Sequence, residues 1–200
     1  MKVVQRSLLI LALTLAGCDR GDPLRPLEPD AVVLAFGDSL TYGTGASAGA
    51  SYPEVLAGLL DRRVINAGVP GEVSAEGRER LPALLDEHRP SLVVLLHGGN
   101  DLLRRKDPSG TAENLRAMVE TARAAGAEVV LLGVPRPGLF LSAADFYGDL
   151  ARELRLPYDG DIVPKLLGDS GLKSDAVHLN AAGYRRLAEA VNALIAQSSR

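Results

Sequence analysis

Tryptophan is absent from this 200-residue chain, and cysteine occurs only once. A single cysteine excludes an intrachain disulfide, so the stability of the fold has to come from core packing. Aromatic residues make up only 4% of the chain and the net charge is −3, which argues against a nucleic-acid-binding surface of stacking rings and basic patches. The 46% of hydrophobic residues is ordinary for a globular protein, and the length fits one domain with a short extension.

The apolar run at the amino terminus is too short to span a bilayer. It covers nine positions, residues 8–16, and follows a basic segment with Lys2 and Arg6. A short apolar run behind basic residues is typical of a secretory signal peptide. The run ends in Leu15-Ala16-Gly17-Cys18, which resembles the bacterial lipobox. We therefore predict a lipoprotein signal peptide over residues 1–17 and lipidation of Cys18. The alternative is a plain signal peptide with an incidental cysteine.

The segment after the signal peptide, residues 18–30, is polar and contains three prolines. Each proline fixes its own φ angle and disfavours helical backbone at the residue before it. We expect a semi-extended tether between the lipid on Cys18 and a domain over residues 31–200. The protein is then expected in the bacterial cell envelope, lipid-anchored on the periplasmic side. Asp19 resembles a retention signal of enteric bacteria that varies between groups, so the choice between inner and outer membrane stays open.

From residue 31 onwards, short apolar runs alternate with segments of helical periodicity. Apolar runs without alternation indicate strands buried on both faces, as in a parallel sheet covered by helices. Repeated strand–helix units predict a three-layer α/β/α, flavodoxin-like fold with a mainly parallel five-stranded sheet in the order 2-1-3-4-5. The expected strands cover residues 31–36, 64–66, 91–97, 128–134 and 156–158, and the expected helices cover residues 51–61, 74–88, 111–125, 142–155 and 180–197.

A candidate nucleophile, Ser39, follows the first apolar run in Gly37-Asp38-Ser39-Leu40. A serine just past the carboxyl end of a strand lies where open α/β sheets bind their ligands. Such a serine needs a base and a group that orients the base. Asp175 precedes His178 by three residues, so one turn can direct the carboxylate at Nδ1 and leave Nε2 for Ser39.

The other two histidines have less specific surroundings. His88 ends a polar helix beside Arg89-Pro90 and is expected to be solvated. His97 ends the third expected strand, and we consider two roles for it: lining an acyl pocket, or a hydrogen bond beside Asn100. The basic run Arg104-Arg105-Lys106 is expected to be solvated, with contact to anionic lipid head groups as the alternative. Because no His, Cys and Asp cluster has metal-ligand spacing, we expect no metal site.

Four sequence blocks together resemble the SGNH (GDSL) hydrolase family. They are Gly37-Asp38-Ser39-Leu40, Gly71 in a Pro-Gly turn, Asn100 in Gly98-Gly99-Asn100-Asp101, and Asp175-x-x-His178. The blocks occur in the family's order, and the resemblance covers residues 31–192. The segments GDSLTYGTGA and GGNDLLR resemble the bacterial arylesterase, thioesterase and lysophospholipase-like subfamily in particular.

This resemblance implies a role for each matching residue. Ser39 matches the nucleophile, and Asp175 and His178 match the orienting carboxylate and the base. The backbone N–H groups of Ser39 and Gly71 and the side-chain amide of Asn100 match the oxyanion hole.

The same residues also have purely structural interpretations. Ser39 could cap the helix that follows the strand, Gly71 could be a simple turn glycine, and Asn100 could be a helix N-cap. One residue departs from the family pattern: Glu72 stands where aspartate is common, and we expect this change to be tolerated.

The expected function is a cofactor-independent serine esterase that hydrolyses carboxylic esters through an acyl-enzyme. Aryl esters, short-chain acyl esters, thioesters and lysophospholipids are the candidate substrates, and a monomer is the default. One alternative is a carbohydrate O-acetylesterase of the same fold, which needs a shallow polar site. The other is a lipid-binding lipoprotein without turnover.

Overall fold

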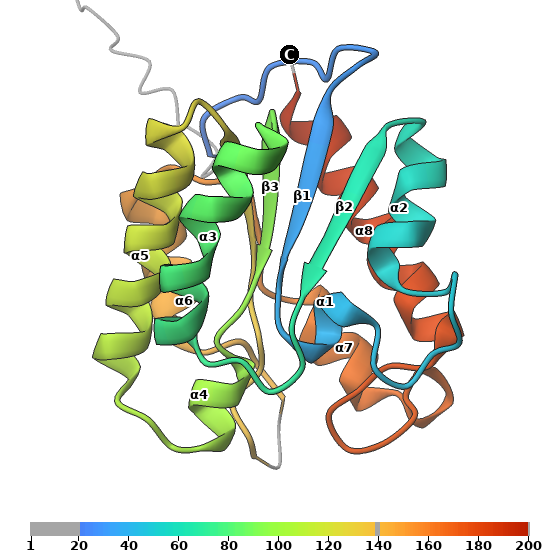
Figure 1. Ribbon diagram of the computed structural model, residues 1–200. Coiled ribbons are helices and arrows are strands. Elements are labelled where there is room, and N and C mark those ends of the chain that lie inside the picture. The colour runs from blue at the N-terminus through green and yellow to red at the C-terminus, as the bar shows by residue number, and fades with distance from the viewer. Residues whose placement is uncertain (1–20, 139–140, 200) are drawn as a thin grey trace, which may run out of the picture.

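The computed structural model describes residues 21–138 and 141–199 and consists of a parallel sheet between two layers of helices (Figure 1). Its strand order is β2-β1-β3-β4-β5, and every neighbouring pair is parallel. The expected fold class and strand order are therefore confirmed. The strands are β1 (Val32–Gly37), β2 (Arg63–Gly68), β3 (Leu92–Leu96), β4 (Glu128–Leu132) and β5 (Tyr158–Asp159).

Longer helices cover both faces of the sheet. On one face, α2 (Tyr52–Leu60) packs against α8 (Ala181–Ser198). On the other face, α3 (Ser74–His88) packs against α5 (Pro108–Ala124), and α6 (Asp145–Glu153) packs beside α5. Right-handed crossovers explain this division. The connection from β1 to β2 runs in one direction along the sheet and the connection from β2 to β3 runs in the other, so their helices lie on opposite faces.

The two central strands form the middle of the core. Every residue of β3 is buried, and so is every residue of β1 after Val32. Both strands are continuous apolar runs, as the burial of both faces of a parallel sheet requires. Their carboxyl ends therefore form a rigid edge on which loops can be placed.

Short helical elements cluster near that edge, and the sequence pattern does not predict them. They are α1 (Ser39–Tyr42), α4 (Gly99–Leu103), α7 (Ile162–Gly168) and the 3₁₀ turn η1 (Ser170–Leu172). In Figure 1, α1, α4 and α7 lie at the lower end of the molecule, where β1, β2 and β3 end. Segments of this length are too short to display a helical period.

The helix expected from Ser142 begins later, at Asp145, with Ala144 as its N-cap. Residues before it are held in an extended turn, because Arg136 N–H donates to the Ser142 carbonyl at 3.0 Å and Ala143 forms a bridge with Pro135. This pairing takes the place of the expected capping box.

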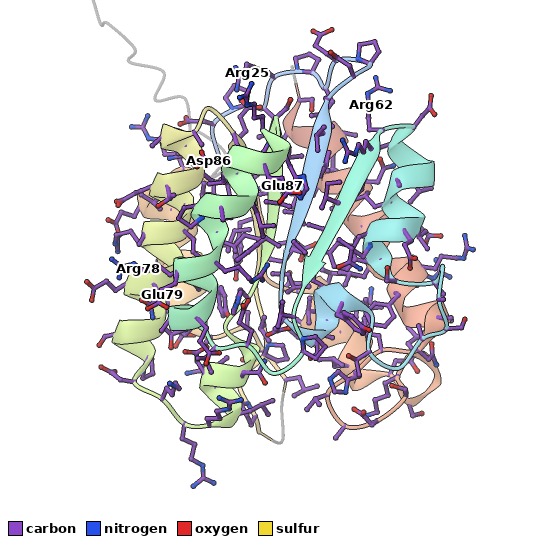
Figure 2. The ribbon with its side chains drawn as sticks, in the orientation of Figure 1. Arg25, Arg62, Arg78, Glu79, Asp86 and Glu87 are labelled. Carbon is purple, nitrogen blue, oxygen red and sulfur yellow. The ribbon has the colours of Figure 1, made fainter. Side chains whose placement is uncertain are left out.

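Residues 21–30 pack on the domain, which differs from the expectation of a separate tether. Leu24 is buried at 5% exposure, and its N–H donates to the Ser198 carbonyl at 2.7 Å. Figure 2 labels two arginines at this end of the molecule, Arg25 and Arg62. The N–H of Arg25 donates to the Glu128 carboxylate, and Arg62 Nη2 donates to the Leu27 carbonyl at 3.1 Å. Cys18 lies outside the described residues.

Charged side chains cover the outward side of α3, where Figure 2 labels Arg78, Glu79, Asp86 and Glu87. All four are exposed, whereas Leu81 and Leu85 of the same helix are buried. Among the described residues, no helix combines the length and apolar character needed to cross a bilayer.

Candidate active site

Ser39 is the first residue of α1, and only Asp38 separates it from the end of β1. The helix is capped by Asp38, whose Oδ1 accepts from Leu40 N–H at 3.2 Å. The capping role considered for Ser39 therefore belongs to Asp38. With its neighbour as the cap, Ser39 presents its hydroxyl to the space beyond the sheet edge.

A continuous hydrogen-bonded chain joins Ser39, His178 and Asp175. The Nε2 atom of His178 lies 3.0 Å from Ser39 Oγ, and its Nδ1 lies 2.8 Å from Asp175 Oδ2. An ionised carboxylate only accepts hydrogen bonds, so Nδ1 carries the proton and Nε2 accepts the proton of the serine hydroxyl. The structure thus brings together the three residues that the sequence singled out.

The loop that supplies Asp175 and His178 is fixed by its own backbone. Asp175 Oδ1 accepts from the N–H groups of Val177 and His178 at 2.8 and 2.9 Å. The hydrogen bond to His178, together with these backbone donors, lowers the pKa of Asp175. The carboxylate is therefore ionised and oriented although its side chain is 53% exposed.

Gly71 and Asn100 line the same cavity as Ser39 and His178. Gly71 has a φ of 82°, which favours glycine, and a Cβ added there would have Arg104 Nη2 as its nearest neighbour at 3.9 Å. Its carbonyl accepts from Arg104 Nη2 at 2.8 Å, so at least one member of the basic run has a structural contact. Gly71 is thus a turn glycine and also a wall of the cavity.

Asn100 is the second residue of α4, whose N-cap is Gly98, so the N-cap interpretation of Asn100 is wrong. Its Nδ2 donates to the Glu72 carbonyl at 3.0 Å. The second proton of this amide faces Asp38 Oδ2 at the longer distance of 3.4 Å. Burial raises the pKa of Asp38, against the opposing effect of nearby histidines and backbone N–H groups.

The cavity around Ser39 and His178 has a volume of about 270 Å³. Apart from the polar residues already named, its walls are mainly apolar and come from several loops at the carboxyl edge of the sheet. These apolar residues are Leu40, Pro70, Leu103, Val134, Pro135, Leu167 and Val177.

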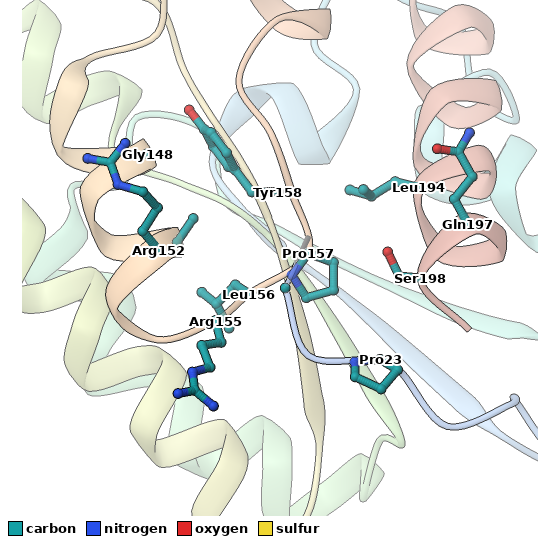
Figure 3. A pocket seen from close by; sticks show the side chains of 12 residues that line it. Pro23, Gly148, Arg152, Arg155, Leu156, Pro157, Tyr158, Leu194, Gln197 and Ser198 are labelled. Carbon is teal, nitrogen blue, oxygen red and sulfur yellow. The ribbon is translucent and has the colours of Figure 1, made fainter. Parts of the chain in front are cut away.

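A second cavity, about 440 Å³ in volume, shares no lining residue with the cavity at Ser39 and is shown in Figure 3. It is bounded by α6, the end of α8 and the segment around Pro23, with Arg152 and Arg155 among its lining residues. None of the candidate catalytic residues borders it. Within the described ranges, no group of three His, Cys, Asp or Glu side chains is placed to hold a metal ion.

Sequence reasoning left the role of His97 open and did not recognise the network around it. His97 is fully buried, does not line the active-site cavity, and its Nε2 lies 3.0 Å from Glu72 Oε2. Arg80 Nε and Nη2 each donate to the Glu72 carboxylate at 2.7 Å. Burial opposes the charge of Glu72 most strongly, but Arg80 and His97 together outweigh it and lower its pKa to about 2. The signal available in the sequence was that Glu72 stands where aspartate is common in the family.

Asp101 is a further buried carboxylate that the sequence analysis did not assign. It accepts from the backbone N–H of Ser74 at 2.7 Å and from its hydroxyl at 2.8 Å. The contact ties α4, which carries Asn100, to the start of α3, which follows Gly71 closely. The two loops that face Ser39 are therefore joined to each other.

A serine–histidine–aspartate chain at the carboxyl edge of a doubly wound sheet defines a serine hydrolase. The comparisons with known proteins make this class specific. The family described as GDSL-like lipase/acylhydrolase matches residues 35–186. The chain belongs to this family, also known as the SGNH hydrolases.

Known relatives and structures agree with this assignment. Esterase TesA of Pseudomonas aeruginosa is 35% identical over 195 residues, which cover 90% of this chain and 95% of that protein. The thioesterase 1/protease 1/lysophospholipase L1 of Escherichia coli K12 is 33% identical over 160 residues, covering 74% of this chain and 75% of that protein. A crystal structure of TesA matches with a TM-score of 0.72 at 32% identity, over 82% of this chain and 97% of that one. The protein is a carboxylic ester hydrolase that acts on small-molecule esters.

Proposed function

We propose that the protein hydrolyses short acyl and aryl esters through an acyl-enzyme on Ser39. The observation that carries the proposal is the chain from Asp175 through His178 to Ser39, with distances of 2.8 and 3.0 Å, opening on a cavity that Gly71 and Asn100 also line. Ser39 Oγ attacks the acyl carbonyl while His178 Nε2 takes its proton, and Asp175 stabilises the resulting imidazolium.

The tetrahedral intermediate carries a negative oxygen that needs donors. The backbone N–H groups of Ser39 and Gly71 supply them in this proposal, together with the Asn100 amide proton that makes the longer, 3.4 Å contact with Asp38 Oδ2. His178 then gives its proton to the leaving alcohol, so the C–O bond breaks and the acyl group stays on Ser39. Water enters with His178 again acting as base, and hydrolysis of the acyl-serine releases the acid.

The walls of the cavity support the acyl and aryl substrate class. Its volume of about 270 Å³ and its lining by side chains such as Leu40, Leu103 and Leu167 suit a compact apolar group. A carbohydrate O-acetylesterase is expected to have a shallow polar site, so the apolar lining favours the first proposal. We expect butanoate and hexanoate esters to react faster than palmitate esters.

A chain-length series tests this proposal. We would measure kcat/KM for p-nitrophenyl esters from acetate to palmitate, and for an acyl-CoA thioester and a lysophospholipid, with Ser39→Ala as the control. A maximum at short or medium chains supports the proposal. Turnover of acetate alone indicates the O-acetylesterase, and binding without turnover indicates a lipid-binding protein.

We also propose that Cys18 carries a lipid that anchors the protein, as a monomer, on the periplasmic side of the cell envelope. The sequence Leu15-Ala16-Gly17-Cys18 supports the anchor. Residues 21–24 pack near the end of α8 and the segment before β5, opposite the cavity at Ser39. The anchor would then hold the catalytic end away from its own membrane.

Membrane fractionation and intact mass test the anchor. The wild type is expected in the membrane fraction with diacylglyceryl mass on an amino-terminal Cys18, whereas Cys18→Ser is expected to lack the lipid. A mature protein that begins at another residue, or carries an unmodified Cys18, contradicts the proposal. Light scattering of a chain starting at Gly21 tests the monomer.

A further inference from the structure

Glu72 follows Gly71 in one of the two loops that face Ser39, and its carboxylate is buried at 6% side-chain exposure. Three donors surround it: Nε and Nη2 of Arg80, both at 2.7 Å, and Nε2 of His97 at 3.0 Å. Arg80 also donates to the Ala67 carbonyl at 3.0 Å and lies over the Phe36 ring at 4.3 Å. The carboxylate is therefore held against β1 and β2, the rigid part of the sheet.

His97 is oriented so that it donates to this carboxylate. Its Nδ1 accepts from Gly98 N–H at 2.8 Å, which places the ring proton on Nε2. The carbonyl of His97 accepts from Tyr147 Oη at 2.7 Å. Hydrogen bonds thus fix both the ring and the backbone carbonyl of His97, and the residue does not border the substrate cavity.

The backbone of Glu72 connects the network to the oxyanion hole. Its carbonyl accepts from Asn100 Nδ2 at 3.0 Å, and its N–H donates to the Val69 carbonyl at 3.2 Å. Gly71, whose N–H is a proposed hole donor, is its immediate neighbour, and the Gly71 carbonyl is held by Arg104. A displacement of Glu72 therefore moves two of the three donors at once.

We propose that Glu72, clamped by Arg80 and His97, is a positioning residue that sets the Gly71 N–H and the Asn100 amide for the oxyanion. The inference rests on the proposed function of this hole. The carboxylate acts through the backbone and touches no substrate. Misplacement by about 1 Å of a group that acts in the transition state costs roughly 10²-fold in rate.

Gly77 of α3 provides the space for this contact. A Cβ at this position would lie 2.5 Å from His97 Nε2 and 3.3 Å from Glu72 Oε2. Gly77→Ala is therefore expected to separate the Glu72–His97 pair without removing either residue. Gly58→Ala in α2 is the matched control, because nothing lies within 4 Å of a Cβ added there.

The first experiment measures kcat, KM and Tm for Glu72→Gln and Glu153→Gln. Glu153 makes a two-pronged contact with Arg116 at 2.7 and 2.8 Å on the surface of the molecule, so its variant removes an exposed arginine–carboxylate pair away from Ser39. Glu72→Gln presents an amide where Arg80 and His97 both donate. We expect kcat to fall by about 10²-fold with KM close to wild type, whereas Glu153→Gln keeps both.

A double-mutant cycle separates positioning from a loss of stability. If Glu72 acts through the Asn100 amide, Glu72→Gln lowers kcat less in an Asn100→Ala background than in the wild type. Equal losses in both backgrounds, or a loss of Tm with unchanged kcat, overturn the inference.

Two further variant pairs keep the test decisive if Glu72→Gln does not fold. His97→Gln retains a donor and is expected to keep more of kcat than His97→Leu, and Gly77→Ala is expected to lose kcat while Gly58→Ala keeps it. If all of them match the wild type in kcat, the inference is wrong. The proposed esterase function fails separately, if the wild type shows no hydrolysis dependent on Ser39.

Discussion

The Asn100 amide makes structural hydrogen bonds and also has a proposed role in the oxyanion hole. One proton of its Nδ2 is donated to the Glu72 carbonyl at 3.0 Å, and the other makes a longer contact of 3.4 Å with Asp38 Oδ2, which also lines the cavity. Since Gly98 is the N-cap of α4, replacing Asn100 does not remove a helix cap. The amide is therefore expected to matter mainly in the transition state.

For Asn100→Ala we predict a loss of kcat of roughly 10²–10³-fold, about 2.7–4 kcal/mol, with a much smaller change in KM. An oxyanion donor stabilises charge that develops only as the bond forms. Steady-state kinetics and a melting curve on the same preparation provide the measurement. A variant that melts earlier but turns over normally would remove Asn100 from the hole.

The substitution Asp175→Asn tests the role of the Asp175 carboxylate, because asparagine has nearly the same shape as aspartate. In Asp175→Asn, the side-chain oxygen can still accept from the N–H groups of Val177 and His178, while the amide nitrogen faces His178 Nδ1. This stabilises the tautomer whose proton lies on Nε2, which cannot accept the proton of Ser39. We predict a fall in kcat of about 10⁴-fold, by analogy with a serine protease.

Circular dichroism is expected to show an intact fold in Asp175→Asn. Retention of a tenth or more of the activity, as a rough threshold, would mean that the carboxylate does not set the tautomer.

Glu72 makes folding stability depend on pH in the acid range. Its pKa is lowered from 4.5 to about 2, so its carboxylate stabilises the folded state fully above pH 4.5, and this contribution is lost as the pH falls toward 2. The shift corresponds to roughly 3 kcal/mol at neutral pH. Urea unfolding at pH 7 and pH 3 is expected to show a smaller pH effect in Glu72→Gln than in Glu153→Gln. The same pH effect in both variants would contradict the ion pair.

For single residues, contacts between positions close in the sequence were predictable, and contacts between positions far apart in the sequence were not. Asp175 and His178 are three positions apart, so their pairing follows from a single turn. Glu72 and His97 are separated by 25 positions, and their contact depends on how the loop after β2 meets the end of β3. No residue pattern within either segment predicts the contact between Glu72 and His97.

Residues 21–30 differ most from the expectation, because they pack on the domain where a separate tether was predicted. Leu24 stands alone between polar residues and prolines, so it has no periodicity to mark it as part of the core. Its burial against the end of α8 is a tertiary effect. The strands, by contrast, were predictable because continuous apolar runs require burial on both faces.

Leu24→Ala is predicted to lower the free energy of unfolding by about 2–5 kcal/mol, because it removes buried methyl groups and leaves a cavity. Its effect on kcat is expected to be negligible, since Leu24 packs at the end opposite Ser39. Half-buried Leu27 is the matched control, and Leu27→Ala is expected to cost less. Equal unfolding midpoints for wild type and Leu24→Ala would show that the segment does not belong to the folded domain.

The candidate active site and the amino-terminal segment lie at two different ends of the molecule. The carboxyl edge of the sheet carries the candidate triad and the two loops with the proposed hole donors, and the opposite end receives residues 21–30 (Figure 1). The fold, and the meeting of Ser39, Asp175 and His178 at one edge of the sheet, were predictable because the blocks follow strands in order. The shape of the cavity was not, since its walls come from loops and short helices with no periodic signal.

Covalent labelling is the direct test of Ser39 as the nucleophile. We would treat the wild type with a fluorophosphonate, digest it, and locate the added mass by tandem mass spectrometry. We predict a single label on Ser39, no label in Ser39→Ala, and no ester hydrolysis by that variant. A label on another residue, or hydrolysis that persists in Ser39→Ala, would contradict it.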